Sequence, residues 1–252
     1  MIPIKNNREL EVMRKACKIT AAARAFAGEM VRPGITTGEI DKAVRDFILS
    51  QGATPSFLHL YGYPASTCIS INETIIHGIP GKRVLSEGDI VSVDVGACFG
   101  GFHGDCAATF ACGEISPEAQ KLIDVTKQSF FEGLKFARQG NRVSDISRAV
   151  QSYAEANGYS VVRAFVGHGV GAQMHEEPEV PNFVTPGKNG PRLFKNMTLA
   201  IEPMVNMGTY ECRILKDGWT TVTADGKLAA HYENTVLITD GEPEILTVTE
   251  GL

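Results

Sequence analysis

The first half of the chain opens with two amphipathic helical patterns. Between residues 7 and 31, apolar side chains recur every three or four positions, at Leu10, Met13, Cys17, Ala21 and Ala25, which is the spacing of one helix face. Asn6 and Glu9 have the spacing of a capping box, and Pro33-Gly34 ends this segment. A long helix is therefore predicted here.

A second helix is predicted directly after the first. Thr36 and Glu39 form another capping-box pattern, and Gly52 ends the helical pattern. The apolar stripe of this helix consists of Ile40, Val44, Phe47 and Ile48.

The second half contains a similar pair of helical patterns. One starts at Ser116-Pro117 and extends to about Gly140, and the other covers about 144–157, before Gly158. Shifted by 106 residues, the two pairs share five identities in 19 positions, which are Gly34/Gly140, Ile40/Ile146, Ala43/Ala149, Val44/Val150 and Gly52/Gly158. These matches indicate a weak internal repeat.

Each helix pair leads into a stretch rich in strand-forming residues, at about 66–112 and 160–247. This order predicts an α+β fold in which the helices gather on one side of a mostly antiparallel sheet. Since no linker-like stretch separates the halves, we expect a single domain over 1–252, with halves of about 1–112 and 113–252.

The composition of the 252 residues is that of an ordinary globular protein, with 43% hydrophobic and 21% charged residues. Without an 18-residue apolar run or an N-terminal apolar stretch of signal-peptide length, a cytoplasmic protein with no membrane contact is expected. The net charge of −5 gives no indication of specific nucleic-acid binding. The six cysteines form no C-x-x-C pair, so they are expected to be reduced, small buried side chains: Cys17, Cys68, Cys98, Cys106, Cys112 and Cys212.

Two aspartates interrupt a predicted β-hairpin. Residues 89–96 and 102–110 have strand patterns, where aspartate is disfavoured. A turn at Phe99-Gly100 would place Asp94 opposite Asp105, and a turn at Gly100-Gly101 would still leave both on one face. Two carboxylates that close repel each other unless a cation lies between them.

The second half repeats this feature, with Glu202 inside the strand pattern at 198–205 and Glu233 inside the one at 231–239. Burying even one unpaired carboxylate is costly. Four embedded acids carry a charge of −4, which two divalent cations would balance. The pattern therefore predicts a carboxylate-bridged dinuclear metal site.

Three histidines accompany these acids. His168 lies in the glycine-lined run GHGVG, His175 follows seven residues later, and His77 lies in IIHGIP. The four acids favour a ligand role for His168. Hydrogen-bonded structural roles are expected for the remaining histidines, which are His59, His103 and His231.

Taken together, these residues resemble the methionine aminopeptidases, in their short bacterial type I form. The resemblance spans nearly the whole chain. Its most specific parts are the interval of 11 between Asp94 and Asp105, the run GHGVGAQMHEEP at 167–178 and the run AIEP at 200–203. The resemblance implies the pita-bread (creatinase/aminopeptidase) fold, whose internal pseudo-twofold would account for the repeat.

The family's motif implies five ligands for two divalent metal ions: Asp94, Asp105, His168, Glu202 and Glu233. Asp105 and Glu233 would bridge the ions, Asp94 would complete one site, and His168 with Glu202 the other. This donor set suits Mn²⁺, Fe²⁺, Co²⁺ or Zn²⁺, and the sequence leaves the physiological ion open.

The implied reaction is removal of the initiator methionine from nascent proteins when the next residue is small. Hydroxide generated at the two metals would attack the scissile peptide carbonyl. Glu202 would be the general base that later protonates the leaving amine, or alternatively a metal ligand only. His175 would donate to the oxyanion, and His77 would position the peptide.

By the same resemblance, the methionine side chain would occupy a pocket formed by Tyr63, Cys68 and Trp219. Phe57 and Met174 depart from the residues that are frequent at their positions in the family, which leaves the pocket's shape open.

Two other classes remain as alternatives. One is an aminopeptidase or dipeptidase of the same fold that acts on Xaa-Pro bonds, although those enzymes usually carry a large N-terminal domain. The other is a binding protein that has lost its metals, although all five ligands are present here. The expected partner is the N-terminal methionine of nascent peptides at the ribosome, and a monomer is expected.

Overall fold

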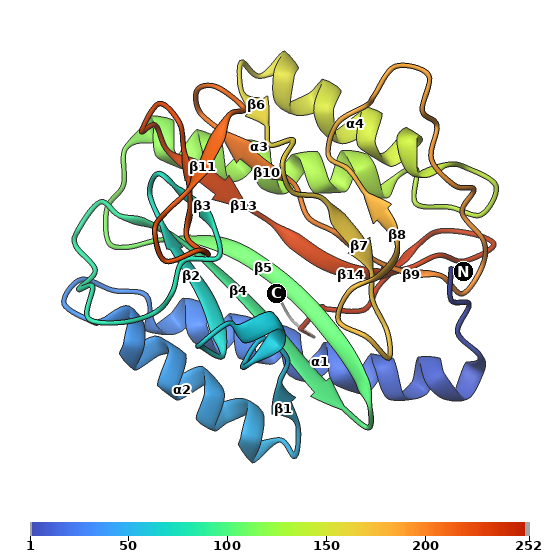
Figure 1. The fold of residues 1–252 in the computed structure, drawn as a ribbon, viewed down its shortest axis with the longest axis horizontal. Coiled ribbons are helices and arrows are strands. Elements are labelled where there is room, and N and C mark those ends of the chain that lie inside the picture. The colour runs from blue at the N-terminus through green and yellow to red at the C-terminus, as the bar shows by residue number, and fades with distance from the viewer. Residues whose placement is uncertain (1, 250–252) are drawn as a thin grey trace.

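The computed structural model describes residues 2–249, and Figure 1 shows their fold. The helices are α1 (Asn7–Met30), α2 (Thr37–Ser50), α3 (Pro117–Leu134) and α4 (Val143–Ala156), together with the short 3₁₀ helix η1 (Leu60–Gly62). Both predicted capping boxes are present. The side chains of Asn6 and Thr36 accept hydrogen bonds from the backbone N–H groups of Glu9 and Glu39, respectively, so each helix begins where its sequence satisfies the free N–H groups of its first turn.

The strands form one large sheet and two small ones, and all their pairings are antiparallel. The large sheet has the order β1-β4-β5-β14-β9-β7-β8, with β2 also paired to β4 and β15 to β14. The small sheets are β13-β10-β6 and β11-β12-β3. The strand bounds are β1 (Thr54–Pro55), β2 (Thr67–Ile71), β3 (Thr74–Ile76), β4 (Ile90–Phe99), β5 (Phe102–Ala111), β6 (Ser160–Val161), β7 (Gly167–Gly169), β8 (Glu176–Val180), β9 (Thr198–Ile201), β10 (Met204–Asn206), β11 (Cys212–Ile214), β12 (Thr221–Thr223), β13 (Ala229–His231), β14 (Glu233–Leu237) and β15 (Glu244–Ile245).

One face of the large sheet is covered by helices. In β4, alternate residues such as Val93 and Val95 share a core with Ile40 and Val44 of α2. The remaining alternate residues, which include Asp94, must then point to the other face. The α+β arrangement with helices on one side of the sheet, predicted from the sequence, is confirmed.

The second half follows the same rule. Leu199 and Ile201 of β9 and Val236 of β14 share a core with Phe130 of α3 and Ile146 of α4. In Figure 1, α1 and α2 lie near the bottom and α3 and α4 near the top. The uncovered face of the sheet between them is available for a site.

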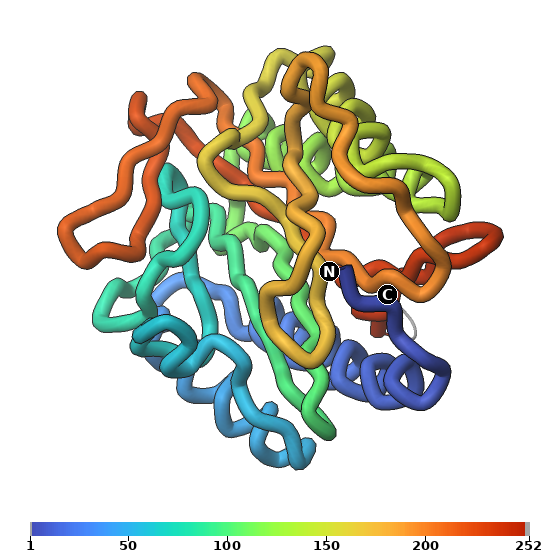
Figure 2. The backbone as a smooth tube through the Cα atoms, turned by 45° about the vertical axis from the view of Figure 1, so that its right-hand side comes forward, coloured from blue at the N-terminus to red at the C-terminus, as the bar shows by residue number. Residues whose placement is uncertain are grey.

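The N-terminal segment lies beside the segment that leads into β9 (Figure 2). The backbone N–H of Lys5 donates to the carbonyl of Asn196 at 3.0 Å. Within residues 2–249, no helix combines the length and the apolar composition that a membrane span needs.

The register of the β4–β5 hairpin corrects one expectation. Gly100 and Gly101, both with positive φ, form the turn, as two-residue hairpins with left-handed central residues require. Asp94 therefore lies opposite Ala107 and Asp105 opposite Gly96, so the two aspartates share a face but are not direct partners.

Two smaller expectations were also wrong. Helix α3 ends at Leu134 and not near Gly140, because the N–H groups of Phe136 and Ala137 bond to carbonyls three residues back and tighten the chain into a turn. Four cysteines are buried free thiols, as expected, but Cys98 and Cys212 are partly exposed.

Candidate metal centre and substrate pocket

Strand pairing brings three carboxylates to one patch of the uncovered sheet face. Asp94 of β4 and Glu233 of β14 both pair with Ala107 of β5, from opposite sides. Directly paired residues point to the same face of a sheet, and so does Asp105, two residues from Ala107. The short side chain of Ala107 leaves the space between the carboxylates open.

Glu202 and His168 complete the cluster from the neighbouring strands. Glu202 directly follows β9, and His168 of β7 pairs with Ala200 of β9. The Nε2 atom of His168 lies 3.4 Å from Asp105 Oδ2 and 3.6 Å from Glu202 Oε1. Its Nδ1 donates to the carbonyl of Gly169 at 2.8 Å, so in the neutral ring Nε2 directs its lone pair at the carboxylates.

The electrostatics of this cluster are unfavourable without a cation. Burial raises the pKa of Asp105 to about 8. It also raises the pKa values of Asp94, Glu202 and Glu233 well above their usual range, and the nearby charge of Asp105 adds to this effect. Burial lowers the pKa of His168 to about 4, so the imidazole contributes no positive charge at neutral pH.

These residues fit divalent metal ions. Among residues 2–249, the buried oxygens Asp94 Oδ1, Asp105 Oδ1 and Glu233 Oε1 have no hydrogen-bond partner. Ligand atoms of Asp105, His168 and Glu233 lie within 4.8 Å of one another. Four carboxylates and one imidazole are a donor set for first-row divalent ions, and such ions would satisfy both the orphaned oxygens and the His168 lone pair.

Two further histidines face the same cavity. The His175 ring lies 4.4 Å from that of His168, nearly perpendicular to it, and stacks on Tyr61 at 5.8 Å. The His77 ring meets Phe165 edge-on at 5.4 Å. Burial lowers the pKa of His77 to about 4, so His77 is neutral at physiological pH.

An apolar pocket adjoins the carboxylates. Tyr63, Cys68 and Met174 are buried in one cluster with Phe57, and Trp219 packs against them. The rings of Tyr63 and Trp219 meet edge-on at 5.1 Å. Because Cys68 of β2 pairs directly with Asp94 of β4, the apolar wall begins next to the metal-ligand cluster.

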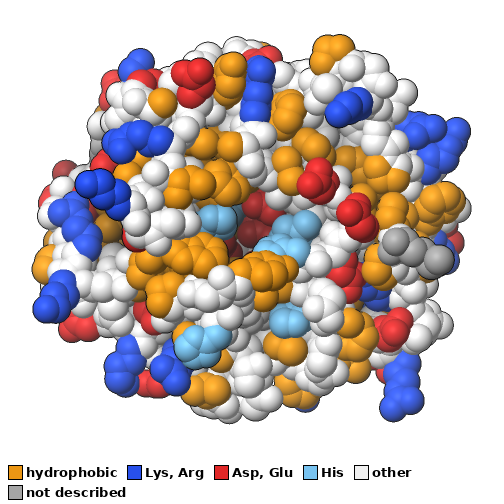
Figure 3. Space-filling view, in the orientation of Figure 1, with side chains coloured by type: hydrophobic (Ala, Val, Ile, Leu, Met, Phe, Trp, Pro, Cys, Tyr) orange, Lys and Arg blue, Asp and Glu red, His pale blue; other side chains and the backbone are white. Residues whose placement is uncertain are grey.

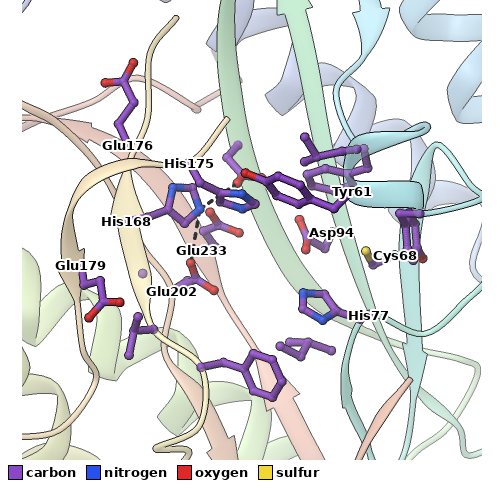
Figure 4. A pocket seen from close by; sticks show the side chains of 18 of the residues that line it. Tyr61, Cys68, His77, Asp94, His168, His175, Glu176, Glu179, Glu202 and Glu233 are labelled. Carbon is purple, nitrogen blue, oxygen red and sulfur yellow. Dashed lines mark ion pairs between the residues drawn. The ribbon is translucent and has the colours of Figure 1, made fainter. Parts of the chain in front are cut away.

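The whole cavity has a volume of about 530 Å³. Figure 3 shows it as a hollow in the middle of this face, with acidic side chains at its floor and histidines and apolar side chains around its mouth. In Figure 4, Cys68 and Tyr61 lie on one side of Glu202 and Glu233, and Glu179 lies on the other.

The structure brings all the site residues predicted from the sequence to this one cavity. They are Tyr63, Cys68, His77, Asp94, Asp105, His168, His175, Glu202, Trp219 and Glu233.

His231 does not have the hydrogen-bonded ring that was expected from the sequence. The buried Nε2 of His231 has no hydrogen-bond partner among the described residues and lies 3.9 Å from Glu202 Oε2 and 3.9 Å from Glu233 Oε2. Its position two residues before Glu233 was the sequence signal that could have indicated this proximity. His103, by contrast, is hydrogen-bonded to Ser56 Oγ at 2.8 Å, as expected.

Tyr61 was missed by the sequence analysis. It is 74% exposed and has a left-handed backbone, with φ of 52°. Its location in an aromatic run, two residues before the predicted pocket residue Tyr63, was the only signal in the sequence.

Comparison with known proteins gives one consistent result. The family model described as metallopeptidase family M24 matches residues 11–240. The methionine aminopeptidase of Clostridium perfringens is 58% identical over 248 residues, covering 98% of this chain and 99% of the relative. Methionine aminopeptidase 1 of Bacillus subtilis is 49% identical over 247 residues, with 98% and 99% covered.

Solved structures agree with the sequence matches. The methionine aminopeptidase of Thermotoga maritima superposes with a TM-score of 0.96 at 43% identity, covering 99% of this chain and 100% of that one. The prolidase of Pyrococcus furiosus shares the fold, with a TM-score of 0.81 at 23% identity, and extends beyond it, since only 66% of that chain is covered. With a family model over most of its length and close relatives over nearly all of it, this chain belongs to metallopeptidase family M24.

Proposed function

We propose that this protein is a metal-dependent aminopeptidase that removes the N-terminal methionine of nascent proteins when the second residue is small. The observation that carries the proposal is the direct contact between an apolar pocket and a cluster of metal-ligating side chains. The pocket takes one unbranched apolar side chain, and the cluster acts on the peptide bond beside it. The names of the full-length relatives support the same substrate.

In this proposal, Asp94, Asp105, His168, Glu202 and Glu233 would hold two divalent ions. When bound, such ions polarise a carbonyl oxygen and lower the pKa of water. Manganese, iron, cobalt and zinc all suit the donor set.

The chain's own residues handle the protons and the orientation. Glu202, whose pKa is raised by burial, takes the proton of the attacking water and returns it to the leaving amine. His175 donates a ring N–H to the oxygen on which charge develops. His77 is neutral and positions the peptide.

Specificity for methionine comes from the apolar wall. Tyr63, Cys68 and Trp219 contact the methionine side chain, and Phe57 and Met174 complete the wall. Sulfur and aromatic rings attract each other, which favours a thioether over a branched aliphatic side chain of similar size.

The proposal also includes the domain organisation, the oligomeric state and the cellular location of the protein. The chain forms a single metallopeptidase domain of two similar halves, about 1–112 and 113–252, each contributing a helix pair. It acts as a monomer in the cytoplasm, on peptides emerging from the ribosome, without membrane or specific nucleic-acid contacts.

A peptide assay with and without a chelator tests the function. We expect cleavage of Met-Ala-Ser and Met-Gly peptides, scarcely any cleavage of Met-Lys or Met-Phe peptides, and none of Ala-Pro or Pro-Ala. Activity is expected to vanish in chelator and to return with Mn²⁺, Fe²⁺ or Co²⁺. Preference for a Xaa-Pro bond would favour a dipeptidase or Xaa-Pro aminopeptidase, and turnover by metal-free protein would overturn the metal-dependent assignment.

A further inference from the structure

A buried ion pair ties the N-terminus to the segment that carries His175. Lys5 Nζ lies 2.5 Å from Glu176 Oε2, and the two side chains are only 4% and 7% exposed. The partners are 171 residues apart in sequence. Taking two charges out of water is expensive, and removing one partner of such a pair leaves a buried charge without compensation.

The pair lies against the turn formed by residues 171–176. The other carboxylate oxygen of Glu176 accepts the backbone N–H of Gln173 at 3.1 Å, and the N–H of Gly171 donates to the carbonyl of Gln173 at 3.0 Å. A Cβ atom on Gly171 would lie 2.5 Å from Lys5 Cε and 2.7 Å from Glu176 Oε1. Only a glycine lets this turn close tightly over the ion pair.

This turn places His175 at the cavity. Neighbouring side chains in an extended segment point in opposite directions. Figure 4 shows this arrangement, with His175 directed toward His168 and Tyr61 while Glu176 points away from Glu202. Fixing Glu176 on one side of the backbone therefore fixes His175 on the other.

We propose that Lys5 is a positioning residue, which through its ion pair with Glu176 holds the His175 ring at the place where it donates to the reacting carbonyl. This inference rests on the proposed function and deepens it. Without the Lys5 ammonium, the buried carboxylate of Glu176 has no compensating charge and moves toward water. The turn then opens, and the His175 ring loses its fixed position.

Lys5→Met tests the proposal against a matched control. Removing an oxyanion donor altogether costs about 10²–10³ in kcat, so a displaced donor is expected to cost about tenfold. The KM for Met-Ala-Ser and the metal affinity measured by calorimetry are expected to stay within about twofold, because Lys5 is not among the residues that line the cavity. Lys5→Arg, which keeps the charge, is expected to restore most of the rate. The control is Lys195→Met, which removes an exposed ion pair with Asp240 and is expected to change nothing.

A double-mutant cycle separates positioning from general stability. If Lys5 acts through His175, Lys5→Met lowers kcat in the wild type but not in the His175→Ala background. An equal fractional loss in both backgrounds, or wild-type kcat in a folded Lys5→Met variant, overturns the proposal. Circular dichroism establishes that each variant is folded at the assay temperature. If Lys5→Met does not fold, Glu176→Gln replaces it in the same cycle with the same expected pattern.

A second readout does not depend on activity. The His175 ring signals in NMR are expected to shift and broaden in Lys5→Met and to stay unchanged in Lys195→Met. If the wild type fails to cleave Met-Ala-Ser, the proposed function fails, and these signals still decide whether the ion pair positions the ring. Unchanged His175 signals in Lys5→Met overturn the positioning role.

Discussion

His168 and His175 lie seven residues apart in one glycine-rich segment, yet their rings meet different neighbours. The ring nitrogen Nε2 of His168 faces two carboxylates at 3.4 and 3.6 Å. The His175 ring lies 4.4 Å from the His168 ring and 5.8 Å from the Tyr61 ring, and it is more exposed than His168. This geometry supports the proposed roles, with His168 as a metal ligand and His175 as a residue that contacts the substrate.

The first prediction follows from that separation. His175→Ala is expected to lower kcat by about 10²–10³, the usual cost of losing an oxyanion donor, while the metal affinity stays nearly intact. His168→Ala is expected to lose both activity and one metal site, because it removes the imidazole ligand proposed for one of the two ions. Calorimetric metal titration beside steady-state kinetics checks both variants. If His175→Ala loses a metal site and His168→Ala keeps it, the two roles are reversed.

A second prediction concerns the pH dependence of stability. Burial lowers the pKa of His77 to about 4, whereas an unfolded histidine has a pKa of about 6.5. Between these values the unfolded chain binds a proton that the folded protein rejects, so the free energy of unfolding falls as the pH falls from 6.5 toward 4. His77→Asn removes this contribution.

The measurement is denaturant unfolding at pH 7 and pH 4.5. The wild type is expected to lose about 2 kcal/mol more than His77→Asn over this interval. Asparagine suits the left-handed backbone at position 77, where φ is 58°. His59→Asn is the control, since His59 is exposed and also has a positive φ of 68°. Equal losses in the wild type and His77→Asn would contradict the prediction.

At the level of elements, the sequence predicted the helices well because their signals are local. The capping boxes at Asn6 and Thr36 lie within one turn of the helix starts they define. The alternation of apolar residues did not determine the register of the β4–β5 hairpin. A turn at Phe99-Gly100 and a turn at Gly100-Gly101 both preserve that alternation. Two consecutive glycines with left-handed φ decide the register.

The last turn of α3 packs closely against α4. Gly133, near its C-terminus, lies so close to α4 that a Cβ atom there would be 2.7 Å from Val150 Cγ2 and 3.2 Å from Ile146 Cγ2. A periodic pattern in one segment contains no information about the distance to another segment. Sequence periodicity therefore could not predict this close contact between the two helices.

The third prediction tests this contact between α3 and α4. Alanine is normally about 1 kcal/mol better than glycine inside a helix, yet Gly133→Ala is expected to destabilise the protein by about 1–3 kcal/mol through overpacking. Chemical denaturation measures the change. Val150→Ala opens space at the same point, so the double variant is expected to lose less than the sum of the two single changes. Additive losses, or a more stable Gly133→Ala, would show that the two helices have room to separate.

For the whole molecule, the acids were easier to predict than their surroundings. Carboxylates embedded in apolar strand patterns are rare, so four of them indicate a common site. The structure brings these acids together in one cavity: Asp94, Asp105, Glu202 and Glu233. Tyr61, which lines the cavity, and His231, which lies beside Glu202 and Glu233, were not predicted, because their local signals do not show what these side chains face. The ion pair of Lys5 was not predicted either, because its partner Glu176 is 171 residues away in sequence. Contacts of this kind leave no local pattern.

The last prediction concerns metal binding and global stability. Asp94 and Asp105 come from β4 and β5, whereas His168, Glu202 and Glu233 come from segments after residue 160. Ions held by both sets bind only the folded chain and also relieve the repulsion among buried carboxylates. A free ion concentration of about 100 times Kd would add about 2.7 kcal/mol. For a chain of this size that corresponds to a rise in Tm of about 5–10 °C.

Thermal unfolding of chelator-treated protein, before and after adding Mn²⁺ or Co²⁺, measures this shift. His168→Ala is expected to show a smaller rise in Tm, because it retains fewer ligands that join the two parts of the chain. Lys195→Met removes an exposed ion pair with Asp240 at a position that does not line the cavity, and this variant is expected to show the wild-type rise. An identical Tm with and without added metal would contradict the prediction, because an ion that binds the folded chain and not the unfolded one must raise Tm. Such a result would mean that the five side chains do not form a metal site of the folded protein.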